Sequence, residues 1–275
     1  MENKYLISVD LDDTLLTSDK IISGYTINEV QNLIKNNHHF ILNTGRPHQG
    51  ALKFLKALNI HEPIIVNNGG AIITYDNDYE KIISIKTFHM NLELVRDFHK
   101  KVKHMLKNAS ITSVFDFYAY DIDSLPFWVV HKSPLINFHS GDIIKNLNTL
   151  PIMSEYYVKK EHEEEFEQIL NSKEFSEFKY IKWGWFDDIV SYEISSKNAS
   201  KGNAMLYLCD LYNIQHKNTF GFGDQLNDLS LLEKANYGVA MINGVEEIKK
   251  NAKYISDFDN NNDGVIKFIN KIIKE

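Results

Sequence analysis

Residues 5–14 of the chain read YLISVDLDDT, an apolar run followed by a cluster of acids. Residues 5–9 are largely apolar and are followed by Asp10, as in a strand that is buried within a parallel sheet. One residue separates Asp10 from Asp12, so in an extended chain their carboxylates point the same way. Two such close carboxylates repel each other, and a divalent cation is the usual way to relieve the repulsion. The stretch therefore predicts a strand that ends in an acidic site.

The chain on either side of this stretch alternates between short apolar runs and helical patterns. Further strands are expected at residues 40–42 and 64–66, a helix opens at Thr26 with capping-box spacing, and residues 71–85 read as a hairpin. The same alternation returns from Ser200 onward. Strands that alternate with helices predict βαβ units and hence a parallel sheet.

The middle of the chain has a different pattern of helices and strands and a higher content of aromatic residues. Residues 87–193 mix helical patterns with strand-like runs and are rich in aromatic residues. We expect an inserted α+β domain with an antiparallel sheet here. The α/β domain is then discontinuous in sequence and consists of residues 1–86 and 194–275.

Composition restricts the class of protein. A chain of 275 residues is long enough for two domains at about 150 residues each. The formal net charge of −7 argues against nucleic acid and anionic membranes as partners. The first residues do not resemble a signal peptide, and no run approaches the roughly 20 apolar residues of a membrane span. Cys209 is the single cysteine, which excludes an internal disulfide, and we expect a cytoplasmic protein.

Four polar clusters follow predicted strands or precede predicted helices. They are residues 10–14 (DLDDT), 43–46 (NTGR), 200–202 (SKG) and 223–228 (GDQLND). In an open α/β sheet, ligands bind in the crevice beyond the carboxyl ends of the strands, so these clusters are expected to meet there. Each cluster alone is as consistent with a helix cap or a turn. Their conjunction and order are what indicate a site.

The residue types in these clusters suit phosphoryl transfer. Mg²⁺ prefers oxygen ligands and commonly binds carboxylates together with a substrate phosphate. The candidate metal ligands are Asp10, Asp12, Asp224 and Asp228. Lys201 and the Thr44 hydroxyl, with neighbouring backbone N–H groups, are candidates for holding phosphate oxygens. A carboxylate can also act as the nucleophile and form an aspartyl-phosphate that water then cleaves.

The order of these motifs resembles that of the haloacid dehalogenase superfamily. The sequence has Asp-x-Asp-x-Thr, then Thr-Gly-Arg, Lys-Gly and Gly-Asp-x-x-Asn-Asp. More narrowly, it is similar to the Cof-type sugar-phosphate phosphatases, which carry a type IIB α/β cap between the second and third motifs. The resemblance runs along nearly the whole chain, and it implies a Rossmann-like core, an inserted substrate-specificity cap, a Mg²⁺ cofactor and a small phosphorylated metabolite as substrate.

The same resemblance implies a role for each motif residue. Asp10 would be the nucleophile and a magnesium ligand, and Asp12 the general acid/base, with its backbone carbonyl on the metal. Asp224 would bind magnesium, and Asp228 would support the metal site. The residues expected to hold phosphate are Leu11 through its N–H group, Thr44, Gly45, Lys201 and Asn227.

Some points stay open at this stage. Asp13 stands where the family usually has glycine, so its role is not defined. The acid at position 12 favours a phosphatase or a phosphomutase over the ATPase branch, and a non-catalytic phosphometabolite sensor is a further alternative. Hexose phosphates, other sugar phosphates, flavin mononucleotide and pyridoxal phosphate are all candidate substrates. Aromatic residues near 115–120 and 183–185 are candidates for selecting among them, although core packing is also consistent with their character.

A second acidic motif is better explained as structure. Residues 259–264 read DNNNDG and resemble the start of a calcium loop, but the twelfth position is Asn270 instead of the bidentate Glu. We expect a polar turn and a helix cap there.

Overall fold

The computed structural model describes residues 4–125 and 135–273. It divides into two compact units. The core unit comprises Met1–Lys86 and Ser200–Glu275, and the insert unit comprises Thr87–Ala199. The first division falls where the sequence analysis places it, and the second falls a few residues later than the expected boundary after residue 193.

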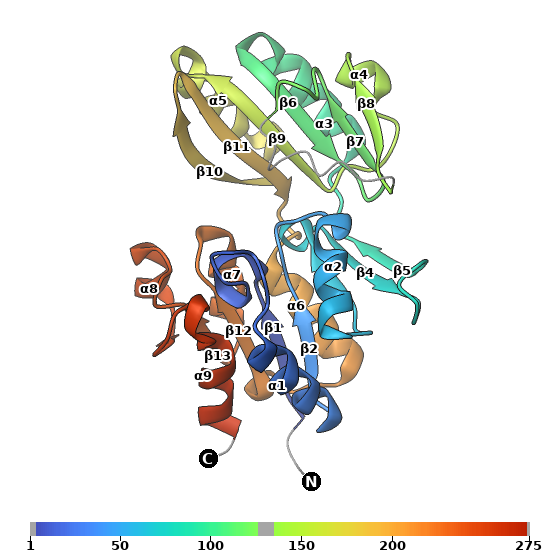
Figure 1. Ribbon diagram of the computed structural model, residues 1–275. Helices are drawn as coiled ribbons and strands as arrows, with labels where there is room; N and C mark the ends of the chain where they lie inside the picture. The colour runs from blue at the N-terminus through green and yellow to red at the C-terminus, as the bar shows by residue number, and fades with distance from the viewer. Residues whose placement is uncertain (1–3, 126–134, 274–275) are drawn as a thin grey trace. The chain divides into compact units, whose positions relative to one another are not determined.

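Five parallel strands form the main sheet of the core unit, in the spatial order β14-β13-β12-β1-β2 (Figure 1). The strands are β1 (Leu6–Val9), β2 (His39–Leu42), β12 (Thr219–Gly223), β13 (Tyr237–Ala240) and β14 (Tyr254–Ile255). In β1, Val9 lies opposite Phe222 on one side and Leu42 on the other. The residues of β1 are completely buried, as expected for a parallel strand that is covered on both faces. The predicted parallel sheet is confirmed, and the carboxyl ends of β12, β1 and β2 lie side by side.

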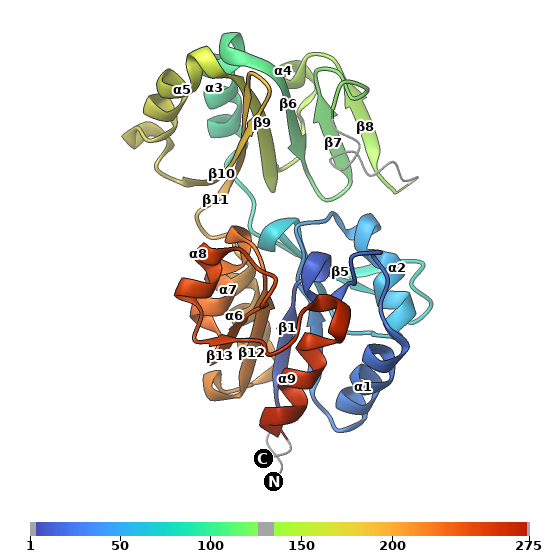
Figure 2. The same cartoon turned by 60° about the vertical axis from the view of Figure 1, so that its left-hand side comes forward.

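Helices cover both faces of this sheet. They are α1 (Gly24–Lys35), α2 (His48–Leu58), α6 (Lys201–Tyr212), α7 (Leu229–Lys234), α8 (Glu246–Asn251) and α9 (Gly264–Ile273). Helices α1 and α9 lie on one face, and α6 and α7 lie on the other (Figures 1 and 2). The expected opening of α1 at Thr26 is wrong, because Ser23 is the N-cap and its hydroxyl accepts the Thr26 N–H. Among the described helices, none combines the length and apolarity that a membrane crossing requires.

A small sheet extends the core unit beyond β2. It has the order β3-β4-β5, with β3 (Ile64–Val66), β4 (Ala71–Tyr75) and β5 (Ile82–Thr87). A parallel bridge between Asn43 and Ile65 connects the end of β2 to β3. The hairpin predicted for residues 71–85 corresponds to β4 and β5.

The insert unit contains a six-stranded sheet in the order β10-β11-β9-β6-β7-β8. Its strands are β6 (Leu106–Thr112), β7 (Asp116–Ala119), β8 (Asn137–Ser140), β9 (Met153–Lys159), β10 (Phe178–Phe186) and β11 (Ile189–Ser196), and its helices are α3 (Leu92–Val102), α4 (Ile143–Asn146) and α5 (Glu163–Leu170). The pairs are antiparallel except β7 and β8, which are parallel. The expected α+β insert is confirmed, and the expected boundary after residue 193 falls inside β11.

The helices of the insert unit pack on one face of its sheet (Figure 2). Phe98 of α3 makes edge-to-face contacts with Tyr156 of β9 and Phe166 of α5, at centroid distances of 5.3 and 5.5 Å. Side chains alternate along a strand, so the neighbours of Tyr156 point to the other face. There Glu155 lies directly opposite Glu193 of β11.

Candidate active site

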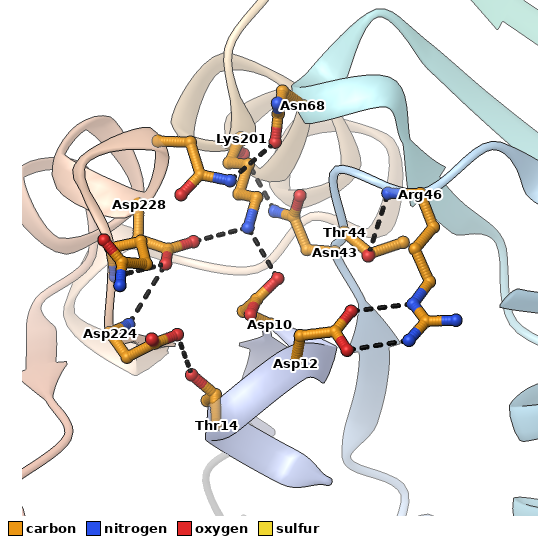
Figure 3. Close-up of polar contacts among 12 residues, drawn as sticks. Asp10, Asp12, Thr14, Asn43, Thr44, Arg46, Asn68, Lys201, Asp224 and Asp228 are labelled. Carbon is orange, nitrogen blue, oxygen red and sulfur yellow. Dashed lines mark hydrogen bonds and ion pairs between the residues drawn. The ribbon is translucent and has the colours of Figure 1, made fainter. Parts of the chain in front are cut away.

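The four motifs meet at the carboxyl ends of β1, β2 and β12 (Figure 3). Asp10 directly follows β1, Asp224 directly follows β12, and Lys201 is the first residue of α6. Asp10, Asp224 and Asp228 are all buried, and each offers an oxygen that lies within 4.8 Å of the others. Residues that are about 200 positions apart in sequence thus converge, as expected for the crevice of an open α/β sheet.

The ammonium of Lys201 lies between two of these acids and binds both. Its side chain is fully buried, and its Nζ donates to Asp10 Oδ1 at 2.6 Å and to Asp228 Oδ1 at 2.5 Å. Burial alone would lower the pKa of Lys201, but attraction to the Asp10 and Asp228 carboxylates outweighs it and raises the pKa. The ammonium is therefore a fixed positive charge in the middle of the site.

The acids are short of positive charge. Burial, followed by repulsion from Asp228 and Asp224, raises the pKa of Asp10 well above its usual range, against the pull of Lys201. Burial and repulsion from Asp228 raise the pKa of Asp224 to about 7, although the Thr14 hydroxyl donates to it at 3.0 Å. With all three carboxylates ionised, the single ammonium of Lys201 would leave two negative charges uncompensated. An all-oxygen site with that charge fits a divalent cation such as Mg²⁺.

Two glycines permit this close approach. A Cβ on Gly223 would lie 2.3 Å from the Asp228 Cβ, so only glycine lets Asp228 fold back over the end of β12. There Asp228 Oδ2 accepts the N–H groups of Asp224 and Gln225. Gly69 has a positive φ of 87°, and a Cβ on it would collide with the backbone of Ser200. The turn after β3 can therefore lie against the start of α6, whose first residue is Lys201.

The residues expected to hold phosphate border the same acids. Leu11 is buried directly after Asp10, and Thr44 is buried with its hydroxyl accepting the Arg46 N–H at 3.1 Å. Gly45 faces Asn68, because a Cβ on it would lie 3.0 Å from Asn68 Oδ1. Asn68 Oδ1 also accepts from Asn227 Nδ2 at 2.9 Å. The Asn68 N–H also donates to the Thr44 carbonyl at 3.1 Å, so hydrogen bonds through Asn68 join the second motif to the fourth.

The Asp12 side chain points away from the other acids. Arg46 donates to both of its oxygens, from Nε to Oδ2 and from Nη2 to Oδ1, each at 2.7 Å (Figure 3). Lys20 Nζ lies 3.2 Å from Asp12 Oδ1. Burial works against the charged form, but Arg46 and then Lys20 lower the pKa of Asp12 below its usual value. Among the described residues, the carboxylate cluster that could hold a metal includes the Asp10 side chain but not that of Asp12.

Comparison with known proteins identifies the family. Residues 7–269 match the family described as haloacid dehalogenase-like hydrolase. The chain belongs to this family. It is 29% identical to the 5-amino-6-(5-phospho-D-ribitylamino)uracil phosphatase YitU of Bacillus subtilis, with 98% of each chain covered. It is 24% identical to the pyridoxal phosphate phosphatase YbhA of Escherichia coli, over 96% of this chain and 97% of that protein.

The solved structures agree with this assignment. The hydrolase matches the HAD subclass IIB sugar phosphatase BT4131 with a TM-score of 0.76 at 21% identity, over 98% of this chain and 99% of that one. The resemblance read from the motifs is confirmed, as is the fold of a parallel-sheet core with an inserted α+β unit. The expected enzyme class, a hydrolase of phosphoric monoesters, is confirmed as well.

Residue 13 of the hydrolase has a backbone conformation that suits glycine. Asp13 adopts a left-handed conformation, with φ 56° and ψ 12°. Its carbonyl accepts from Asn243 Nδ2 at 2.7 Å, and its Oδ1 accepts from Lys20 Nζ at 3.1 Å. Arg46 lies in the Thr-Gly-Arg motif, but its role beside Asp12 has no signal in the sequence, and Lys20 lies in no motif.

The DNNNDG segment of the hydrolase forms a polar turn and a helix cap, as expected. Asp259 Oδ1 accepts the Asn262 N–H at 3.0 Å, in the manner of a helix cap. Asp263 Oδ1 accepts from the hydroxyls of Ser23 and Thr26 at the start of α1. These contacts tie the end of the chain to α1.

Proposed function

We propose that this hydrolase is a Mg²⁺-dependent phosphatase of small phosphorylated metabolites, with sugar phosphates as the leading substrate class. The observation that carries the proposal is the buried group of Asp10, Asp224, Asp228 and Lys201. A fixed ammonium beside three acids supports a site in which a carboxylate accepts a phosphoryl group.

The magnesium site would be formed by side chains already in place. Asp10, Asp224 and Asp228 supply carboxylate oxygens, and the carbonyl of Asp12 is the fourth protein ligand that we assign. A bound Mg²⁺ would supply positive charge that stabilises the phosphoryl oxygens in the transition state. Lys201 supplies charge from the protein itself.

In the first step, an Asp10 carboxylate oxygen attacks the phosphorus of the ester. A P–O bond forms to Asp10 while the bond to the leaving oxygen breaks, and Asp12 donates its proton to that oxygen. The products are a free alcohol and an aspartyl-phosphate. We assign the holding of the phosphoryl oxygens to Leu11 N–H, Thr44, Gly45, Lys201 and Asn227.

In the second step, ionised Asp12 takes a proton from water. The water oxygen attacks phosphorus, and the bond between phosphorus and the Asp10 oxygen breaks. Inorganic phosphate is released, Asp10 is again a carboxylate, and Asp12 again carries its proton.

The test is the isosteric substitution Asp10→Asn, with the exposed Asp210→Asn on α6 as the matched control. Hydrolysis of p-nitrophenyl phosphate with Mg²⁺ should be lost in the first variant and unchanged in the second. Chelation of Mg²⁺ should also abolish hydrolysis by the unmodified protein. Retained activity in Asp10→Asn would contradict the mechanism.

A panel of esters would then define the substrate. It should contain sugar phosphates, flavin mononucleotide and the two compounds in the relatives' names, pyridoxal phosphate and the ribitylaminouracil phosphate. Release of inorganic phosphate identifies a phosphatase, whereas transfer to a second hydroxyl of the sugar identifies a phosphomutase.

A free metabolite fits the net charge of −7, which repels nucleic acids and anionic membranes. A cytoplasmic location is part of the same proposal.

We assign the choice of substrate to the insert unit, as the family resemblance implies. Phe115 and Trp183 are large aromatic side chains that are 41% and 43% exposed, which supports a contact role more than a packing role. The side chain of Trp185 lies outside the described part of the chain. Phe115→Ala and Trp183→Ala should change the ranking of esters by kcat/KM and leave the Mg²⁺ dependence intact. An unchanged ranking in both variants would count against this assignment.

A further inference from the structure

Arg46 holds the Asp12 carboxylate in one orientation. Its guanidinium donates to both carboxylate oxygens at 2.7 Å, which is the bidentate geometry that fixes direction as well as distance. The guanidinium also lies over the ring of Phe54, 5.4 Å from the ring centroid, and the Arg46 side chain as a whole is 19% exposed. The Arg46 side chain is therefore itself supported, and Asp12 is held against a fixed partner.

Lys20 reaches the same carboxylate from a turn further along the chain. The turn is closed by the Thr17 N–H donating to the Ile21 carbonyl at 2.9 Å and by the Lys20 N–H donating to the Thr17 carbonyl at 2.8 Å. Lys20 has a left-handed φ of 58° in this turn. Its Nζ lies 3.2 Å from Asp12 Oδ1 and 3.1 Å from Asp13 Oδ1.

Asp13 gives Lys20 a second anchor. A glycine at position 13 would allow the same left-handed backbone but would offer Lys20 no carboxylate. With aspartate there, the ammonium is shared between Asp12 and Asp13 instead of being held by Asp12 alone. A lysine side chain loses substantial conformational entropy when it is fixed, and two partners restrict it better than one.

We propose that Lys20 is a positioning residue for Asp12, that Asp13 anchors Lys20 in this role, and that Arg46 holds the same carboxylate through its two hydrogen bonds. Lys20, Asp13 and Arg46 together form what we call the Asp12 clamp. The inference rests on the proposed function, in which Asp12 gives its proton to the leaving oxygen. A general acid must lie within hydrogen-bond reach of that oxygen, and a misplaced donor costs rate without abolishing binding.

The test uses two esters that differ in their need for the acid. p-Nitrophenolate leaves without a proton, whereas an alkoxide must be protonated as it leaves, as in glucose 6-phosphate. In Lys20→Met, kcat/KM for the alkyl ester should fall about 10-fold, while kcat/KM for the aryl ester should change less than about 3-fold. A merely structural role for Lys20 would lower both values alike, and that result would overturn the proposal.

Companion variants test the clamp as a unit. Lys20→Arg keeps the charge and should retain most of the activity toward the alkyl ester. Asp13→Gly should lower the ratio of kcat/KM for the alkyl ester to kcat/KM for the aryl ester by about 3-fold. The double variant with Lys20→Met should have the same ratio as Lys20→Met alone, because both changes remove the same contact between Lys20 and Asp13. A fully additive loss in the double variant would contradict the anchoring role of Asp13.

Two controls keep the outcome interpretable. Lys35→Met removes an exposed lysine near the end of α1 and should leave both ester activities unchanged. Melting temperatures of all variants should match that of the unmodified protein, which separates a loss of positioning from a loss of folding. The Asp10→Asn result is independent of these ratios. If the Lys20 and Asp13 variants do not behave as expected, the proposed phosphatase mechanism still stands. A failure of that mechanism would show in the Asp10→Asn variant instead.

Discussion

At the scale of single residues, the ammonium of Lys201 is the main compensation for the buried acids. Lys201→Met would leave Asp10 and Asp228 buried without their cation. Removing one partner of a buried ion pair costs about 3–5 kcal/mol, so the free energy of unfolding should fall by about that much in Mg²⁺-free urea denaturation. Lys271→Met is the control, because its pair with Asp257 is exposed and contributes less than about 1 kcal/mol. Similar losses in both variants would argue against this account of the site.

The raised pKa of Asp224 predicts that protons compete with Mg²⁺. In the metal-free protein this carboxyl has a pKa of about 7, because it is buried and close to Asp228. Below that pH a proton must leave before the metal can bind, so the apparent affinity for Mg²⁺ should rise between about pH 6 and pH 8. Calorimetry in buffers of different ionisation enthalpy should show proton release on Mg²⁺ binding, most strongly near the lower pH. An affinity that is constant across this range would exclude such competition.

The motif residues could be predicted from sequence, whereas the partners of Asp12 could not. Asp10, Lys201 and Asp224 carry signals in their spacing and neighbours, and the structure brings them together. Lys20 reaches Asp12 from a turn in which its own backbone is left-handed, a conformation that lysine seldom adopts. The sequence around residue 20 contains no pattern that predicts such a turn.

At the scale of secondary-structure elements, the insert unit holds an unfavourable pair of acids. Glu155 of β9 lies opposite Glu193 of β11, and Tyr157 Oη donates to Glu155 Oε2 at 2.8 Å. Burial, with repulsion from Glu193, raises the pKa of Glu155 to about 7. The folded state therefore binds a proton more tightly than the unfolded state. The stability that this proton confers is complete below the unfolded pKa near 4.5 and is lost as the pH rises through about 7.

Glu155→Gln should therefore stabilise the protein only at higher pH. At about pH 8 its free energy of unfolding should exceed that of the unmodified protein by about 1–2 kcal/mol, and the difference should vanish near pH 4. Glu164→Gln, at an exposed position of α5, should have little effect at either pH. Urea denaturation across this pH range provides the measurement. A gain that did not depend on pH would point to packing instead of charge.

Element types could be predicted more reliably than their ends. Helix α1 begins at Gly24 and not at Thr26, because Ser23 both caps the helix and donates to Asp263, which is 240 positions away in the sequence. The parallel pairing of β7 with β8 also differs from the expected antiparallel sheet. Both features depend on contacts between distant segments, and local patterns do not contain them.

At the scale of the whole molecule, the insert unit is one continuous segment with its own core. A fragment of residues 87–199 should therefore fold alone and melt cooperatively in circular dichroism. A fragment of residues 87–193 should not, because it lacks Ile194, which is buried in that core and pairs with Tyr180 and Ser154. Equal folding of the two fragments would mean that β11 is dispensable beyond residue 193.

The two-unit organisation was predictable because the hydrophobic pattern changes near residue 87 and changes back near residue 200. The second division was predicted too early, since β11 reads as a strand but its sequence does not reveal which sheet it joins. Its partners are β9 and β10, so it belongs to the insert unit.

The discontinuity of the core unit also has a consequence for synthesis. Strand β1 has β2 on one side and β12 on the other, and β12 begins only at Thr219. A ribosome therefore makes Asp10 long before it makes Lys201, Asp224 and Asp228, which surround it in the folded protein. The contiguous insert can fold in the meantime, because domains form as units during translation. A chain that ended before Thr219 would leave the β12 edge of β1 unpaired next to Asp10, and such a product would be inactive but prone to aggregate.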